Sequence, residues 1–281
     1  MKKTMPSTPG NSTKKISGNL TEPFGAYAPT WLQATLIRLG RANPIFRAAF
    51  RTRINRLLQN IRAGAIDYEL FGWDFRFFPA DNTADRKALL TPKGFDRREC
   101  ELIAEHLDPN GLFLDIGSNI GIYSFYVAAY RSDAIIFAFE PVPSVFNKLI
   151  FNLRINKLSD RVSVSNLALA NKTGEMSFNT DLESLVLGKP DTTVPTDTLL
   201  NVITERGASA ISALKIDTEG AEAMILQPFF EAAHKSIWPK IVVIEHLFPE
   251  KWEWNCIDFL EGHGYAPIWR GKMNTVYKIS S

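Results

Sequence analysis

Cysteine is scarce in this sequence, because Cys100 and Cys256 are the only two among 281 residues. Two cysteines so far apart exclude a disulfide framework and a zinc site built from several cysteines. Long apolar runs are missing too: no stretch reaches the 18 apolar residues that predict a transmembrane helix. The N-terminal lysines are not followed by the apolar core of a signal peptide. We therefore expect a cytoplasmic protein.

Acidic residues are almost absent from the N-terminal part of the chain. Residues 1–63 contain 11 of the 32 lysines and arginines but one acidic residue, Glu22, so their net charge is +10. The remaining residues carry a net charge of −8. This asymmetry predicts that the basic segment contacts an anionic surface or the acidic part of the same chain.

Two kinds of sequence make up this basic segment. Residues 1–29 are rich in small polar residues, proline and lysine, which predicts a partly disordered tail. Residues 30–64 have helical periodicity interrupted at Asn43-Pro44, which predicts a basic extension of two helices. Their apolar stripe consists of Leu36, Leu39, Phe46, Phe50, Leu57 and Ile61. We expect the stripe to brace the rest of the protein; a partly free stripe would instead let residues 31–62 lie on an anionic membrane surface.

Residues 65–281 are predicted to form one domain of alternating strands and helices. Residues 66–80 suggest a hairpin that turns near Gly72. The further strands are predicted at 112–116, 135–140, 162–169, 176–178, 213–217, 241–245, 266–269 and 275–279, and the helices at 97–107, 120–130, 144–156, 198–206, 221–230 and 252–261. Such alternation requires a mostly parallel sheet with helices on both faces, so the expected fold class is a doubly wound, Rossmann-like α/β fold.

A glycine-rich turn follows the strand at 112–116 and opens the next helix. Gly117 and Gly121 allow the backbone to pass close to a ligand. A dinucleotide-binding turn has glycine where this turn has Asp115, and a carboxylate there would repel a pyrophosphate but suits the ammonium of a methionyl group. Glu140 ends the next strand, where an acid can accept hydrogen bonds from both hydroxyls of a ribose. The turn therefore favours S-adenosylmethionine over a nicotinamide dinucleotide.

Four segments carry a more specific signal. They follow one another as DIGSNIGIYS, FEPVPSVFNKLIFNLRIN, NLALANKTGEMSF and LKIDTEGAEAMIL. In this order they resemble the FkbM family of methyltransferases, and the resemblance covers residues 66–280. It implies a seven-stranded sheet whose last strand is antiparallel, S-adenosylmethionine as the methyl donor, and transfer to an oxygen, often a sugar or polyketide hydroxyl.

The resemblance also implies the residues of the donor site. By this resemblance the methionyl side is lined by Asp115, Gly117, Asn119 and Gly121, the ribose is bound by Glu140, and the adenine lies against Asn166, Leu167 and Ala168. Ser118, which stands where the family commonly has alanine, and Pro141 belong to the same motifs and complete the predicted site.

The acceptor side is predicted at the ends of two later strands. Lys215 and Asp217 share one face of the strand at 213–217, so Asp217 is expected at its carboxyl end as a general base or ligand contact. Glu219 in the following turn faces the cleft or caps the next helix. Glu245 and His246 end the next strand, where histidine is either a base or structural. Oxygen and nitrogen ligands could bind a metal, but their spacing does not demand one, so no metal is predicted.

The predicted function is an S-adenosylmethionine-dependent methyltransferase that methylates a hydroxyl of a sugar, glycan or other small-molecule acceptor. A nucleic-acid methyltransferase could use the basic arm for phosphate contacts, but the catalytic part is acidic and no Asn-Pro-Pro-Tyr motif for base extrusion occurs. A nicotinamide dehydrogenase is disfavoured by Asp115. A non-catalytic scaffold that only binds the donor stays open as an alternative, although the glycine and acidic positions of the motif are intact.

Overall fold

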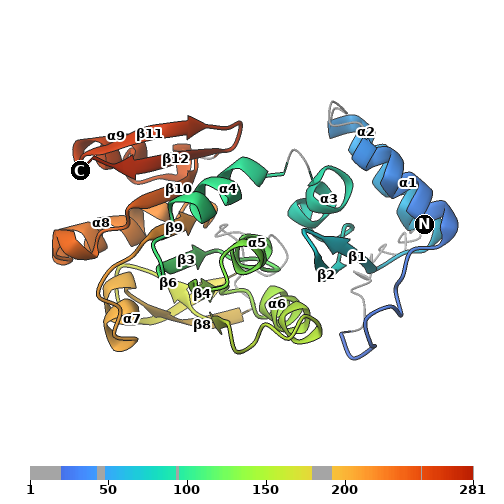
Figure 1. The fold of residues 1–281 in the computed structure, drawn as a ribbon, viewed down its shortest axis with the longest axis horizontal. Coiled ribbons are helices and arrows are strands. Elements are labelled where there is room, and N and C mark those ends of the chain that lie inside the picture. Colours follow the sequence, from blue (N-terminus) through green and yellow to red (C-terminus); the bar gives the residue numbers. More distant parts are fainter. Residues whose placement is uncertain (1–19, 43–47, 93–94, 179–191, 248, 281) are drawn as a thin grey trace, which may run out of the picture.

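The centre of the protein is a seven-stranded sheet (Figure 1). This computed structural model describes residues 20–42, 48–92, 95–178, 192–247 and 249–280. The strand order is β11-β12-β10-β9-β3-β4-β5. The strands are β3 (Leu112–Ile116), β4 (Ile135–Phe139), β5 (Val162–Ser165), β9 (Ala213–Ile216), β10 (Ile241–Glu245), β11 (Tyr265–Arg270) and β12 (Asn274–Ile279). All neighbouring strands are parallel except that β12 is antiparallel to both β10 and β11. The doubly wound fold and its antiparallel last strand are confirmed.

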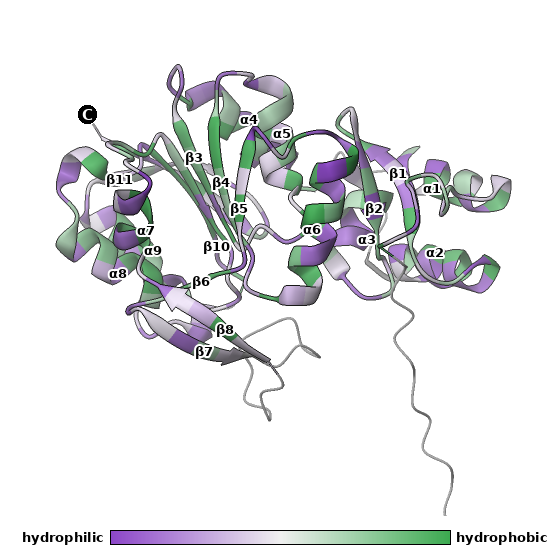
Figure 2. Cartoon of the chain, turned by 90° about the horizontal axis from the view of Figure 1, so that it is seen from below, coloured by the Kyte–Doolittle hydropathy of each residue, from purple (hydrophilic) through white to green (hydrophobic). Residues whose placement is uncertain are grey.

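Helices cover both faces of this sheet. One face is covered by α4 (Arg97–His106), α5 (Ile122–Tyr130) and α6 (Pro143–Ile155), and the other by α7 (Leu199–Glu205), α8 (Glu222–Ala232) and α9 (Cys256–Gly262) (Figure 2). Successive residues of β3 alternate between the two cores: Phe113 packs into the first, and Leu112 and Leu114 pack into the second. The strands are apolar on both sides because neither side faces water.

A hairpin and an unpredicted helix precede the sheet. Strands β1 (Ile66–Leu70) and β2 (Trp73–Phe77) pair antiparallel, and the turn at Gly72 is the predicted one. The following helix, α3 (Thr83–Leu90), was not expected from the sequence. Its N-terminus is capped by Asn82, whose side-chain oxygen accepts hydrogen bonds from the backbone amides of Ala84 and Asp85. Helix α3 contacts the hairpin on one side and both N-terminal helices on the other.

The N-terminal helices are α1 (Trp31–Ala42) and α2 (Ala48–Ile61), so the two expected helices are confirmed, and Asn43-Pro44 lies outside the described residues. The predicted apolar stripe coincides only in part with the face that they bury, since Leu36 and Phe50 pack against the main core but are only partly buried. The buried residues are Gln33, Ile37 and Gly40 of α1 and Ile54, Asn55 and Leu58 of α2, whereas Leu39, Leu57 and Ile61 are exposed, and Phe46 lies outside the described residues. Because Gln33 is one of the buried residues, a search for apolar residues alone does not find this face. The glutamine is tolerated because its amide donates to the backbone oxygens of Leu58 and Arg62.

The second half of the predicted tail, residues 20–29, contacts the hairpin. Asp67 accepts hydrogen bonds from the backbone amides of Gly25 and Tyr27, and Arg76 donates to the backbone oxygens of Glu22 and Pro23. Asp67 and Arg76 themselves form a buried ion pair, with 2.7 Å between Oδ1 and Nε. The segment is therefore anchored by polar contacts that its composition does not reveal.

Three other differences concern element boundaries. The strand expected at 162–169 is split, because β6 (Ala168–Leu169) leaves the main sheet and pairs with β8 (Thr192–Asp197), which also pairs with β7 (Gly174–Phe178). Strand β8 was not predicted, and residues 179–191 lie outside the described chain. Helix α9 begins at Cys256 rather than near Trp252, because Asn255 caps it and the preceding tryptophans bond to α8. None of these changes alters the main sheet.

Candidate functional site

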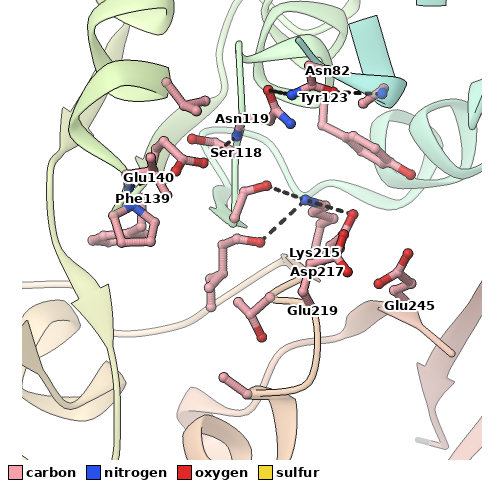
Figure 3. A pocket seen from close by; sticks show the side chains of 18 of the residues that line it. Asn82, Ser118, Asn119, Tyr123, Phe139, Glu140, Lys215, Asp217, Glu219 and Glu245 are labelled. Atoms are coloured by element: carbon pink, nitrogen blue, oxygen red, sulfur yellow. Dashed lines mark hydrogen bonds and ion pairs between the residues drawn. The ribbon is translucent and has the colours of Figure 1, made fainter. Parts of the chain in front are cut away.

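A cleft of about 700 Å³ lies at the carboxyl ends of the central parallel strands (Figure 3). Its lining comes from the turn after β3, the end of β4, the β5–β6 connection, the ends of β9 and β10, and helix α3. Residues of the cleft include Asn82, Ser118, Asn119, Phe139, Glu140, Lys215, Asp217, Glu219 and Glu245. The site lies where doubly wound sheets bind ligands.

The turn after β3 is fixed to the strands on both sides of it. Gly117 has φ +72°, and a Cβ added there would overlap the backbone oxygen of Asp217, so only glycine fits. The backbone amides of Gly117 and Ser118 donate to the oxygen of Phe139 at 3.0 and 2.9 Å. The Oγ of Ser118 is buried and has no hydrogen-bond partner among the described residues, although Ser118 lines the cleft. A buried orphan hydroxyl of this kind fits a polar group of a bound ligand.

Glu140 is oriented toward the cleft by the backbone around it. Its Oε2 accepts from the amide of Asn119 and its Oε1 accepts from the amide of Val142, both at 2.9 Å. These two amides fix the orientation of the carboxylate, which also lines the cleft. Glu140 therefore has the geometry expected of an acceptor for a pair of ligand hydroxyls.

Two predicted donor-site residues lie behind the cleft rather than in its lining. Asp115 is fully buried, and its Oδ2 accepts from the hydroxyl of Ser124 at 2.6 Å and from the Ser124 amide at 3.2 Å. Burial raises the pKa of Asp115, and the neighbouring Lys215 opposes this shift. Gly121 has φ +93°, and a Cβ there would lie 2.6 Å from Leu149 and 2.7 Å from Phe125. Both residues therefore hold the turn and α5 in place, and neither is among the residues that line the cleft.

Lys215 joins the two sides of the site. Its Nζ donates to the backbone oxygens of Gly117 at 2.7 Å and Ile116 at 3.3 Å. The same Nζ lies 3.7 Å from both Asp115 and Asp217. Burial disfavours the ammonium, but the charges of Asp217 and Asp115 outweigh it and raise the pKa of Lys215. Lys215 is therefore paired with two carboxylates and stays charged between them.

The acceptor-side carboxyl groups meet at the ends of β9 and β10. One oxygen each from Asp217, Glu219 and Glu245 lies within 4.8 Å of the others. Burial and the charge of Asp217 raise the pKa of Glu219, and burial together with the charge and hydrogen bond of Asp217 raises that of Glu245 to about 9. The raised pKa favours the protonated form of Glu245, which can donate a hydrogen bond to Asp217. Three such oxygens could also hold a divalent cation, which would replace the shared proton.

The raised pKa of Glu245 predicts that stability depends on pH. This carboxyl has a pKa of 4.5 when unperturbed and about 9 in the folded protein, so the folded state binds more protons between these values. Its contribution is complete below the lower value and is lost as the pH rises through the upper one. Glu245→Gln, which cannot titrate, should make the free energy of unfolding fall less steeply across this range.

Denaturant unfolding at several pH values between about 4.5 and about 9 measures this slope. Glu253→Gln, which changes an exposed acid, is the matched control and should keep the wild-type slope. Equal slopes for Glu245→Gln and the wild type would contradict the raised pKa.

The other predicted site residues are divided between the cleft and its surroundings. Pro141, Leu167 and Ala168 line the cleft. Asn166 does not, and its amide instead donates to the backbone oxygens of Glu140 and Pro141 at 2.8 Å. His246 also lies away from the cleft, with Nδ1 3.3 Å from the hydroxyl of Thr275. Burial and Arg270 lower its pKa. His246 thus does not join the carboxyl groups that line the cleft.

Helix α3 supplies site residues that sequence analysis missed. Asn82 and Lys87 line the cleft, and Asn82 donates to the side-chain oxygen of Asn119 at 3.1 Å. The signal was present, because Asn82 precedes a helical run that ends in Ala88-Leu89-Leu90, and asparagine is a preferred N-cap. Asp96 and Tyr123 also line the cleft. No local pattern indicates them, since their elements reach the site only through packing.

Comparison with known proteins finds a family match over the part of the chain that runs from β3 into β11. The family model of the methyltransferase FkbM domain matches residues 115–267. The 31-O-demethyl-FK506 methyltransferase FkbM of Streptomyces tacrolimicus is 26% identical over 201 residues, which cover 58% of this chain and 75% of that protein. The AMB antimetabolite synthetase AmbE of Pseudomonas aeruginosa is 33% identical over 72 residues, which cover 26% of this chain and 3% of that protein.

Solved structures are similar at lower identity. The FkbM methyltransferase from Methylobacillus flagellatus KT has a TM-score of 0.45 and 15% identity, and the match covers 70% of this chain and 55% of that one. This chain thus spans little more than half the length of that relative. A caffeoyl-CoA O-methyltransferase from Staphylococcus aureus, described as putative in its name, also has a TM-score of 0.45 and 15% identity, with 66% of this chain and 84% of that chain covered.

Proposed function

The chain belongs to the FkbM family of S-adenosylmethionine-dependent methyltransferases, and from this premise we propose that it methylates a hydroxyl oxygen of a sugar, glycan or other small molecule. The observation that carries the proposal is the group of carboxyl side chains at the ends of β9 and β10, across the cleft from Glu140 (Figure 3). The name of the Streptomyces relative, which describes a substrate that lacks a methyl group on an oxygen, supports transfer to oxygen.

The donor would occupy the wall of the cleft formed by the ends of β3 and β4. Glu140 would accept hydrogen bonds from the ribose hydroxyls, and Leu167 and Ala168 would pack against the adenine. The turn at 117–119 would bind the methionyl part, with the orphan hydroxyl of Ser118 as a polar contact. When bound, S-adenosylmethionine supplies a methyl group that is already activated for transfer. The remaining task of the protein is to align an acceptor oxygen and to receive its proton.

Asp217 is the group that we propose to receive this proton. Asp217 lines the cleft, and the Nζ of Lys215 lies 3.7 Å from its Oδ2. Glu245, whose raised pKa favours the protonated form, would donate a hydrogen bond to Asp217 and leave the other oxygen of Asp217 to contact the acceptor hydroxyl. As the acceptor oxygen gains the methyl group, its hydrogen passes to Asp217. Glu219 would bind a neighbouring hydroxyl of the acceptor.

Glu140→Ala should weaken binding of the donor and of its demethylated product. Loss of hydrogen bonds to a charged acceptor costs about 2–3 kcal/mol, which corresponds to a roughly 30- to 150-fold higher dissociation constant. Isothermal titration with S-adenosylhomocysteine measures the change. Glu205→Ala removes an exposed acid far from the cleft and should bind like the wild type. Equal affinity of Glu140→Ala and the wild type would rule out the ribose contact.

The acceptor class is tested by supplying S-adenosylmethionine with a labelled methyl group. Separate reactions contain free sugars, nucleotide sugars, lipid-linked sugars and RNA. Label on a sugar hydroxyl that appears far more slowly when the enzyme carries Asp217→Asn is the expected result. Label on RNA alone would favour a nucleic-acid methyltransferase and contradict the proposal.

A further inference from the structure

The two N-terminal helices expose a face that combines large apolar side chains with arginines. Exposure reaches 76% for Trp31, 54% for Leu39 and 50% for Leu57. We call this face the α1–α2 outer face; it consists of Trp31, Leu32, Arg38, Leu39, Arg53, Arg56, Leu57 and Ile61. The spacing of its residues places those of each helix on one side of that helix. On each helix the exposed residues therefore form one continuous strip rather than separate positions.

The outer face is not needed to hold the helices on the protein. Ile37, Ile54 and Leu58 are at most 3% exposed and belong to the main hydrophobic core, and both helices contact α3 with this buried side. Figure 1 shows α1 and α2 at the end of the molecule opposite β11 and β12, and Figure 2 shows them side by side. The apolar side chains of the outer face therefore point away from the body and increase its exposed apolar surface without stabilising it.

The arginines of this segment fall into two groups. Arg41 and Arg62 have structural partners: Arg41 donates to the backbone oxygens of Leu89 and Glu69, and Arg62 donates to those of Tyr27 and Ala28. The outer-face arginines, Arg38, Arg53 and Arg56, are exposed and form no ion pair with any residue that the structure describes. No acidic residue occurs between Glu22 and Asp67 to neutralise them. Their positive charge is therefore available to an anionic partner.

We propose that the α1–α2 outer face binds the surface of an anionic phospholipid membrane. Leucine, isoleucine and tryptophan would enter the boundary between head groups and acyl chains, while the arginines contact lipid phosphates. A helix that only binds the phosphates of RNA gains nothing from exposed leucine and isoleucine, which cannot stack on bases as aromatic rings do. A second copy of the same face would bring the three arginines of each copy into one interface without any acidic residue of the face to neutralise them, because a two-fold interface uses the same patch on both copies.

The outer face and the cleft are connected through one helix. Helix α3 contacts α1 and α2, and it also provides Thr83 and Lys87 to the lining of the cleft. A membrane bound at the outer face would thus be separated from the cleft by two helical layers, α1 with α2 and then α3. No helix of the described residues is long and apolar enough to cross a bilayer, so the association would be peripheral.

The test is co-sedimentation of the full-length protein with vesicles. Phosphatidylcholine vesicles are compared with vesicles that also contain phosphatidylglycerol. One variant combines Arg53→Gln with Arg56→Gln, and a second combines Leu39→Ser with Leu57→Ser. The matched controls are Arg154→Gln with Lys272→Gln, and Ile135→Ser with Ile268→Ser, which change exposed residues of the same kinds elsewhere. Binding of S-adenosylhomocysteine confirms that each variant is folded.

We expect binding that requires phosphatidylglycerol and weakens as salt is added. The arginine variant should bind roughly 30-fold more weakly, the factor that corresponds to two basic residues at about 1 kcal/mol each. The leucine variant should also bind more weakly, and both controls should bind like the wild type. The proposal would be overturned if the wild type stayed in solution with anionic vesicles, if the folded variants bound like the wild type, or if RNA alone were bound through these arginines. Vesicle binding does not require turnover, so this test is independent of the acceptor.

Discussion

Asp217→Asn is expected to lower the rate of methyl transfer by about 100- to 10,000-fold, which is the range that general acid–base groups contribute. Asparagine keeps the shape of the side chain but cannot take up the acceptor proton. The substitution also removes one of the two carboxylates that lie 3.7 Å from Lys215. The wall of the cleft that would bind the donor, at the ends of β3 and β4 with Glu140, is unchanged. Turnover should therefore fall far more than the affinity for S-adenosylhomocysteine.

Single-turnover kinetics with the labelled acceptor measure this effect, and Asp160→Asn, at an exposed position, is the control. Turnover equal to that of the wild type would exclude Asp217 as the base and leave alignment of the acceptor as the mechanism. Treatment with a chelator tests a further mechanism, in which these carboxyl groups bind a metal ion. Loss of activity on chelation and its return with a divalent ion would mean that Asp217, Glu219 and Glu245 act as metal ligands rather than sharing a proton.

Asp67→Asn should lower the free energy of unfolding by about 3–5 kcal/mol, the range for breaking one side of a buried ion pair. The guanidinium of Arg76 is fully buried, with Nε 2.7 Å and Nη2 2.9 Å from the two oxygens of Asp67. Neutralising Asp67 leaves this charge without its counter-ion. It also weakens the hydrogen bonds from Gly25 and Tyr27 that hold the N-terminal segment on the hairpin.

Urea unfolding of wild type and variant gives this difference in free energy. The control is Glu101→Gln, which breaks the surface pairs with Arg97 and Arg98; such exposed pairs contribute at most about 1 kcal/mol. A similar small loss in Asp67→Asn would show that the buried pair does not stabilise the fold.

The main sheet could be predicted because each of its central strands is an apolar run between polar or glycine-containing turns. The expected strands at 112–116 and 241–245 agree with β3 and β10 at both ends. The two faces of the sheet are covered, so the pattern of the strands and the alternation with helices determine the architecture together. Residues 162–169 were harder to interpret, because nothing local shows that the chain leaves one sheet at Asn166 and joins another.

A place in the cleft could be predicted where the chain itself brings a side chain to a strand end, as for Glu140 and Asp217. It could not be predicted where contacts between distant parts of the chain determine the position of the side chain. Asp115 is in the glycine motif, yet its carboxyl group bonds to Ser124 instead of facing the cleft. His246 directly follows Glu245, but the side chains of successive residues near a strand point to opposite sides. The contribution of α3 depends on its packing between the hairpin and the N-terminal helices.

The bond between Lys215 and the carbonyl of Gly117 has a consequence for the order in which the protein folds. The two residues are 98 positions apart, so closing this contact restricts a long loop and carries an entropic cost that local helices do not have. Strand β9 must dock beside β3 before the lysine can reach the turn. A nascent chain that ends before Lys215 therefore contains the whole glycine motif but lacks the cation that fixes its carbonyls. The ligand-binding turn is completed only when the later half of the sheet has assembled.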